Sequence, residues 1–242
     1  MSALTPESKA RSEIIRLIEE KKLGISSVIE SPMLYCSRQT VTKILTRMKL
    51  FEMIREVQGS IVECGVYKAD SLLTFFHMST IFEPFSFTRK IIGFDSFKGF
   101  PMVSEQDNSE FAKVNHLSDV DLSHIQKIVE IQEINKALPE INRIQLIEGN
   151  VESSIPRYLV ENPHLIISLL YLDFDLYEPT KIALEYFLPK VTIGGIVAFD
   201  ELNQLKWKGE TRAFDEIIGI NNVALEKMSF DGHVSYFRVQ KQ

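Results

Sequence analysis

The chain has 242 residues, 45% of them hydrophobic, which is enough for one large domain with a full core, with or without a helical extension. Its 27 basic and 33 acidic residues give a net charge of −6, and no cluster of lysine and arginine stands out. Nucleic-acid binding depends on such clusters, so the composition argues against a nucleic-acid partner. No apolar stretch is long enough to span a bilayer, so we expect no membrane partner either.

The cysteine content favours a reducing compartment. There are only two cysteines, Cys36 and Cys64, and Cys64 lies in an apolar run where it is expected to pack as a small core residue. The first residues lack the basic start and apolar core of a signal peptide. We therefore expect a cytoplasmic protein without a structural disulfide.

Residues 1–57 are expected to form a helical extension. The sequence Thr-Pro-Glu at residues 5–7 is a good helix start, with proline early and an acid in the first turn. Residues 25–37 are predicted to be loop, and an amphipathic pattern predicts a helix over 38–57. Because no linker rich in Pro, Gly or Ser follows, we expect this extension to pack as a lid on a second domain, residues 58–242.

From residue 58 onward, strand and helix patterns alternate. Strands are predicted at 60–66, 90–94, 143–147, the apolar part of 166–175, 193–199, 223–228 and 233–239. Helices are predicted at 70–81, 122–136, 151–160, 179–188 and 209–218, with a long polar loop over 96–122. The alternation predicts an α/β fold whose parallel sheet is covered on both faces. A hairpin turn at Asp231-Gly232 makes one strand antiparallel.

Two neighbouring strands of this pattern end in acids. Asp173 and Asp175 end one apolar run, and Asp200 and Glu201 end the next. Ligands of open α/β sheets bind beyond the carboxyl ends of the strands, so we expect these four carboxylates around one spot. They would repel one another there unless a cation lay between them. Mg²⁺ prefers oxygen ligands, and the pattern therefore predicts a divalent-cation site.

The first three strands end in residues suited to an adenosine-containing ligand. Glu63 and Gly65 lie where the first strand turns toward a helix, and a glycine there lets the backbone approach a ligand. Asp95 ends the second strand, where an acid can accept ribose hydroxyls. Gly149 and Asn150 follow the third strand and suit the adenine ring. The dinucleotide fingerprint and the P-loop are both missing, which favours S-adenosylmethionine.

Several long motifs resemble the macrocin O-methyltransferase family, from about residue 38 to the end. They are IVECGVYKADS at 61–71, GFDSFKGFP at 93–101, LDFDLYEPT at 172–180, FDEL at 199–202 and WKGET at 207–211. The resemblance implies the class I methyltransferase fold, a Rossmann-like three-layer sandwich with a seven-stranded, mostly parallel sheet and a C-terminal antiparallel hairpin. It also implies S-adenosylmethionine as donor and a divalent ion, usually Mg²⁺. The expected acceptor is a sugar hydroxyl on a nucleotide-linked deoxysugar or a glycosylated natural product.

The resemblance also assigns roles to residues. The donor would be bound by Glu63, Gly65, Tyr67, Ser71, Asp95, Ser96, Gly149, Asn150 and Asp173. The metal ligands would be Asp173, Asp200 and Glu201, and the catalytic residues Asp173 and Asp175. Asp175 is a candidate for the general base, a further metal ligand or a helix cap. The family's first loop is usually richer in glycine than the Lys-Ala-Asp found here at 68–70.

Other features of the sequence leave alternatives open. An Asp-x-Asp at a strand end is also typical of metal-dependent glycosyltransferases, the main alternative function, although the second acid pair favours methyl transfer. The ring of Trp207 could stack on a sugar or pack within the protein. Substrate choice is expected to depend on residues 25–37 and 102–122. The resemblance favours a homo-oligomer of two or more subunits.

Overall fold

The computed structural model describes residues 5–107 and 110–241, and it divides into two compact units, Met1–Leu45 and Thr46–Gln242. The first unit contains α1 (Pro6–Glu20), α2 (Ile25–Glu30), α3 (Pro32–Tyr35) and the start of α4 (Arg38–Ile54). Thr5 caps α1, as the sequence suggested, by accepting a hydrogen bond from the Ser8 amide. The prediction of loop over 25–37 was wrong, because α2 and α3 are too short to show a helical period.

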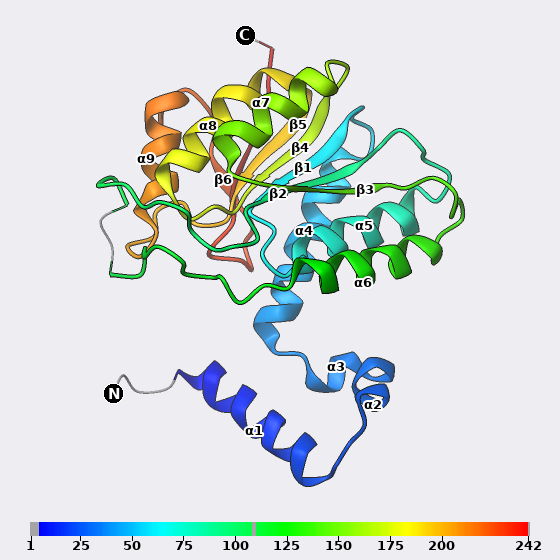
Figure 1. The fold of residues 1–242 in the computed structure, drawn as a ribbon. Coiled ribbons are helices and arrows are strands. Elements are labelled where there is room, and N and C mark those ends of the chain that lie inside the picture. The colour runs from blue at the N-terminus through cyan, green and yellow to red at the C-terminus, as the bar shows by residue number, and fades with distance from the viewer. Residues whose placement is uncertain (1–4, 108–109, 242) are drawn as a thin grey trace. The chain divides into compact units, whose positions relative to one another are not determined.

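The second unit is built on a seven-stranded sheet (Figure 1). Its strands follow the order β3-β2-β1-β4-β5-β7-β6. Their bounds are β1 Ser60–Cys64, β2 Ile91–Asp95, β3 Ile144–Glu148, β4 Ile167–Leu172, β5 Val191–Phe199, β6 Glu226–Lys227 and β7 Ser235–Arg238. The first five strands are parallel, and β7 runs antiparallel to both β5 and β6. The predicted mostly parallel sheet with a C-terminal hairpin is confirmed.

Helices cover both faces of the sheet. They are the end of α4, α5 (Asp70–Phe82) and α6 (Leu122–Ile134) on one face, and α7 (Val151–Glu161), α8 (Tyr177–Phe187) and α9 (Lys208–Ile217) on the other (Figure 1). Each face has its own apolar core: Leu50, Phe51 and Ile54 of α4 pack in the first, and Phe187 of α8 and Phe214 of α9 pack in the second. Fully burying such a side chain contributes about 1.5–3 kcal/mol.

The two acid-tipped strands lie side by side in the sheet. Cys64 of β1 pairs with Leu172 of β4, and Leu172 pairs with Phe199 of β5, so the carboxyl ends of these three strands are level. The chain order reverses between β1 and β4, which is where open α/β sheets bind ligands. Within the described ranges, no helix is both long and apolar enough to cross a membrane.

Candidate active site

Backbone hydrogen bonds continue past the strand ends and tie the site segments together. The Gly65 amide donates to the Phe94 carbonyl at 2.9 Å, and the Asp173 amide donates to the Cys64 carbonyl at 2.8 Å. The Asp200 amide in turn donates to the Leu172 carbonyl at 3.0 Å. The segments that carry the predicted donor and metal residues therefore lie next to one another at the carboxyl ends of the strands, as the sequence indicated.

Gly65 is required by how closely two strand ends approach. Its φ is +94°, and a Cβ there would lie 2.0 Å from the carbonyl oxygen of Asp173. Both facts exclude a larger residue. The turn is further fixed by Asp95, whose carboxylate accepts hydrogen bonds from the amides of Val66 at 2.7 Å and Tyr67 at 2.8 Å.

We expect Gly65→Ala to destabilise the protein by about 1–3 kcal/mol, the usual cost of overpacking, and to lower activity further by displacing Asp173. Urea unfolding and a methyl-transfer assay measure the two effects. Gly232→Ala is the matched control, because a Cβ at Gly232 meets nothing within 4 Å. Equal stability of the two variants would contradict the close approach described above.

Glu63 is a fully buried acid of β1. Neither of its carboxylate oxygens has a hydrogen-bond partner at normal distance among the described residues. Burial raises the pKa of Glu63 to about 8, against the opposing effects of the Arg47 charge and the nearby Ser71 hydroxyl. An unpaired buried carboxylate is costly, so this position suits a cationic group of a ligand.

A second group of acids gathers at the ends of β4 and β5. Burial and the charges of Asp200 and Asp175 raise the pKa of Asp173 well above its usual range. Burial, followed by the charge of Asp175, does the same to the pKa of Glu210 on α9. Hydrogen bonds show that these acids are close in space, since the amides of Asp175 and Glu201 both donate to the Glu210 carboxylate. Glu210 lies in the WKGET motif and was expected in a substrate-facing turn or a helix cap, but it was not among the predicted catalytic, donor-binding or metal residues.

Arg47 lies between the two groups of acids. Its Nη2 is 3.7 Å from Asp200 Oδ1, its guanidinium lies 5.1 Å from the ring centre of Tyr171, and its Nε donates to Ser71 at 2.8 Å. Asp200 Oδ1 also accepts a hydrogen bond from the Tyr171 hydroxyl. Asp200, a predicted metal ligand, therefore has the cation of Arg47 beside it. The contacts with Arg47 and with Tyr171 both involve Oδ1 of Asp200, and neither involves Oδ2.

Arg47 was not predicted as a site residue, although its position in the sequence indicates that it is buried. Arg47 falls on the apolar stripe of α4, three, four and seven residues before the buried Leu50, Phe51 and Ile54. A charge on the buried face of a helix requires a partner, and the acids at the strand ends supply it. Arg47 is itself only 3% exposed, so its guanidinium is buried beneath the acids at the strand ends.

The predicted metal ligands come from two adjacent loops. Asp173 follows β4, and Asp200 and Glu201 follow β5. Glu201 Oε2 lies 3.9 Å from Nδ1 of His233. In residues 5–107 and 110–241, no group of three or more His, Cys, Asp or Glu side chains is already arranged to hold a metal ion.

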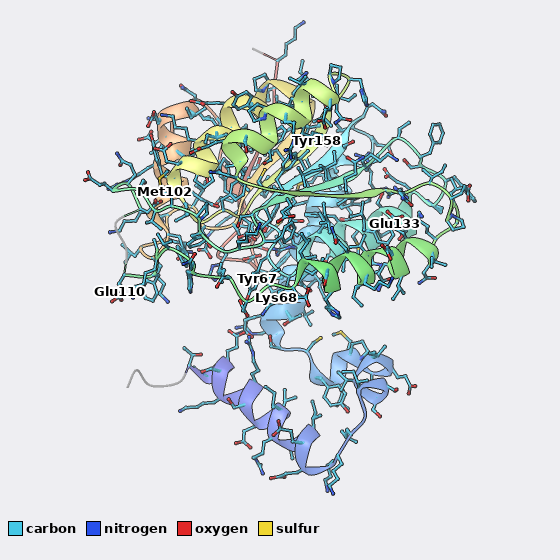
Figure 2. The ribbon with its side chains drawn as sticks, viewed as in Figure 1. Tyr67, Lys68, Met102, Glu110, Glu133 and Tyr158 are labelled. Carbon is cyan, nitrogen blue, oxygen red and sulfur yellow. The ribbon has the colours of Figure 1, made fainter. Side chains whose placement is uncertain are left out.

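The remaining predicted donor residues have partners within the protein. Tyr67 and Lys68 lie next to each other (Figure 2). The Tyr67 hydroxyl donates to Asp119 Oδ1 at 2.8 Å, and Lys68 donates to Oδ2 at 2.6 Å. Ser96 donates to the Gly99 carbonyl at 2.7 Å. Asn150 is the N-cap of α7, and Gly149 before it has a φ of +141°. Their roles in donor binding stay predictions.

Two alternatives are narrowed by the structure. Leu176, and not Asp175, is the N-cap residue of α8, and the amide of Tyr177, the first residue of that helix, donates to Asp107. The ring of Trp207 stacks on His116 at 6.0 Å and meets Phe100 edge-on at 6.0 Å, which favours packing over sugar stacking. Phe100 and His116, in the loop predicted to be polar over 96–122, thus form a small aromatic cluster with Trp207.

Comparisons with known proteins identify the family of the chain. The model of the macrocin O-methyltransferase (TylF) family matches residues 42–239. A crystal structure of CalS11, described as a calicheamicin methyltransferase, is 32% identical, with 98% of this chain and 94% of that chain covered and a TM-score of 0.92. An apo structure of CalS11, described as a TDP-rhamnose 3'-O-methyltransferase, is 29% identical, with 98% and 96% covered and a TM-score of 0.82.

The structure of the O-methyltransferase NovP is 20% identical, with 82% of this chain and 79% of that chain covered and a TM-score of 0.65, and it shows the shared fold. No curated protein sequence matches the chain. The matches confirm the predicted class I methyltransferase fold and favour methyl transfer over the glycosyltransferase alternative. The chain therefore belongs to the macrocin O-methyltransferase (TylF) family and is an S-adenosylmethionine-dependent O-methyltransferase.

Proposed function

We propose that this enzyme methylates a sugar hydroxyl of a small-molecule acceptor, with a divalent cation, Mg²⁺ or a similar ion, at the ends of β4 and β5. The observation that carries the proposal is a charge imbalance. Arg47 is the cation that acts on Glu63, Asp173 and Asp200, while Asp175 and Glu210 add further negative charge beside them. Cationic ligands would relieve this imbalance, and a sulfonium donor and a metal ion are both cationic.

The donor side of the site lies at the ends of β1, β2 and β3. Glu63 has the free acceptor oxygens that an α-ammonium group requires. Gly149, with a positive φ, leaves room beside the backbone, and Asp95 and Asn150 lie at the ends of β2 and β3. S-adenosylmethionine supplies the electrophilic methyl group when it is bound.

The chemistry of the donor atoms fits a hard divalent cation. Asp173, Asp200 and Glu201 supply carboxylate oxygens, which Mg²⁺ prefers, and repulsion from Asp200 and Asp175 already contributes to the raised pKa of Asp173. These three residues would hold the ion. A bound divalent cation lowers the pKa of a coordinated hydroxyl and orients it.

Asp175 is the residue that we assign to proton removal. It lies two residues after Asp173 in the same loop and is 8% exposed. An acceptor hydroxyl must lose its proton as the methyl group is transferred, and a positioned carboxylate typically contributes about 10²–10⁴-fold to such a step. The remaining alternative, a fourth metal ligand, is distinguished by whether Asp175→Asn lowers metal affinity.

The acceptor class is supported by a relative. CalS11 is described as a TDP-rhamnose 3'-O-methyltransferase of calicheamicin biosynthesis. We propose a nucleotide-linked sugar or a glycosylated natural product for this enzyme. Homo-oligomerisation, a lid role for residues 1–57 and a cytoplasmic location stay predictions.

The test combines calorimetry with an activity assay. We expect heat from S-adenosylmethionine binding, methylated product with TDP-rhamnose or a related sugar nucleotide, and loss of turnover in EDTA that Mg²⁺ restores. Donor binding without the metal should persist, because the proposed contacts of the donor with Glu63 and the Gly65 backbone do not involve the ion. Full turnover in EDTA would overturn the metal assignment, and failure to bind the donor would overturn the proposed function itself.

A further inference from the structure

The loop after β4, which carries Asp173 and Asp175, is held by two buried carboxylates from distant parts of the chain. Glu210 of α9 accepts a hydrogen bond from the Asp175 amide through Oε1 at 3.4 Å. Asp107, from the loop between β2 and α6, accepts one from the Tyr177 amide through Oδ1 at 2.7 Å. Alternate amides of one short loop are therefore bound by two different segments.

Each carboxylate also holds a second segment. Glu210 Oε2 accepts from the Glu201 amide at 3.1 Å, so this side chain joins the loop after β4 to the loop after β5. Asp107 Oδ2 accepts from both the amide and the hydroxyl of Ser104 at 2.8 Å, which fixes residues 104–107 of its own loop. The two acid-bearing loops and the loop between β2 and α6 are thus linked through two side chains.

The segments of Gly209, Asp107 and Tyr177 are tightly packed where they meet. A Cβ on Gly209 would lie 2.3 Å from both Asp107 Oδ1 and the Tyr177 amide nitrogen, so the backbone of α9 lies against the backbone after β4 and against the Asp107 side chain. Asp175 itself has a φ of +62°, which is unfavourable for a residue other than glycine. Such a conformation persists where the surrounding contacts impose it, and it is concentrated at functional sites.

Stability alone does not explain the choice of an acid at position 210. Glu210 is fully buried, and Asp175 and Asp200 place like charges beside it, so the carboxylate is costly where it lies. What the ionised carboxylate provides is geometry, because in that form it has two equivalent acceptor oxygens and no donor. A glutamine would offer one oxygen and would turn an amide group toward the second backbone N–H.

We propose that Glu210 and Asp107 are positioning residues for methyl transfer, which hold the loop after β4 so that Asp173 and Asp175 face the acceptor hydroxyl. This inference rests on the proposed function. Neither residue needs to touch the acceptor or the donor, since both act through the backbone of that loop. The WKGET motif thereby gains a role that the sequence did not suggest, with Gly209 allowing the approach and Glu210 making the bonds.

The test uses Glu210→Gln and Asp107→Asn in the full-length enzyme. For Glu210→Gln we expect a kcat about 10–100-fold below wild type, the range typical of residues that orient ligands of a site, and an S-adenosylmethionine Kd within twofold. We also expect a melting temperature close to that of wild type, because removing the buried repulsion offsets the loss of one hydrogen bond. Asp107→Asn should lower kcat in the same way. Asp215→Asn, an exposed position on α9, is the matched control.

The outcomes separate positioning from a general structural role. A fall in kcat without a fall in melting temperature supports the inference. Wild-type kcat in both variants overturns it, and so does a parallel loss of stability, donor affinity and kcat in both. If Glu210→Gln does not fold, Asp107→Asn decides alone by the same criteria. A wild-type enzyme that binds no S-adenosylmethionine would instead refute the proposed function.

Discussion

Asp200→Asn is expected to lower kcat for methyl transfer by at least about 100-fold while it leaves the Kd for S-adenosylmethionine within about threefold. Asparagine keeps the oxygen that accepts the Tyr171 hydroxyl, so the side chain should stay in place. It lacks the negative charge that a divalent cation requires. Donor affinity should persist because Glu63, on β1, is separated from β5 by β4 in the sheet.

The measurements are steady-state kinetics across a range of Mg²⁺ concentrations and calorimetry with the donor. Glu226→Gln, at an exposed position on β6, is the control and should match wild type in both. A collapse of donor affinity in Asp200→Asn would show that Asp200 also acts on the donor side. Arg47 would be the connecting residue, since it lies 3.7 Å from Asp200 and its charge acts on Glu63.

The parts of this site that follow from local sequence were predictable. Apolar runs that end in acids identified β4 and β5, and the parallel arrangement of the sheet made their ends converge. The first turn was also readable, because a glycine directly after a buried strand indicates a close approach, and Gly65 contacts the backbone of Asp173. In each case one short segment of sequence and the parallel arrangement of the strands were sufficient to place the residue at the site.

The parts that depend on contacts between distant segments were not predictable. Arg47, Asp107 and Glu210 reach the site from α4, a long loop and α9, and their partners are mostly backbone groups or acids far away in sequence. No periodic pattern encodes such contacts. The short helices α2 and α3 were missed for a different reason, since neither is long enough to establish a hydrophobic period.

Glu63 should make the stability of the donor-free enzyme depend on pH. Its pKa is raised from 4.5 to about 8 by burial, so the folded state binds a proton more tightly than the unfolded state. Between those pH values the contribution of Glu63 to the free energy of unfolding therefore falls as pH rises, by up to about 1.4 kcal/mol per pH unit. Urea unfolding of Glu63→Gln should lack this component, and Glu178→Gln, a partly exposed position on α8, should retain it.

The same group should make donor binding depend on pH in the opposite direction. If the α-ammonium of S-adenosylmethionine lies against Glu63, it stabilises the ionised carboxylate, so binding releases a proton below about pH 8. Affinity should then rise by up to about tenfold per pH unit from pH 6, and should fall above about pH 8 as the free α-amino group loses its own proton. Calorimetry in two buffers of different ionisation enthalpy counts the released protons. Glu63→Gln should bind with no rising limb, whereas a flat wild-type profile from pH 6 to 8 would remove Glu63 from the donor site.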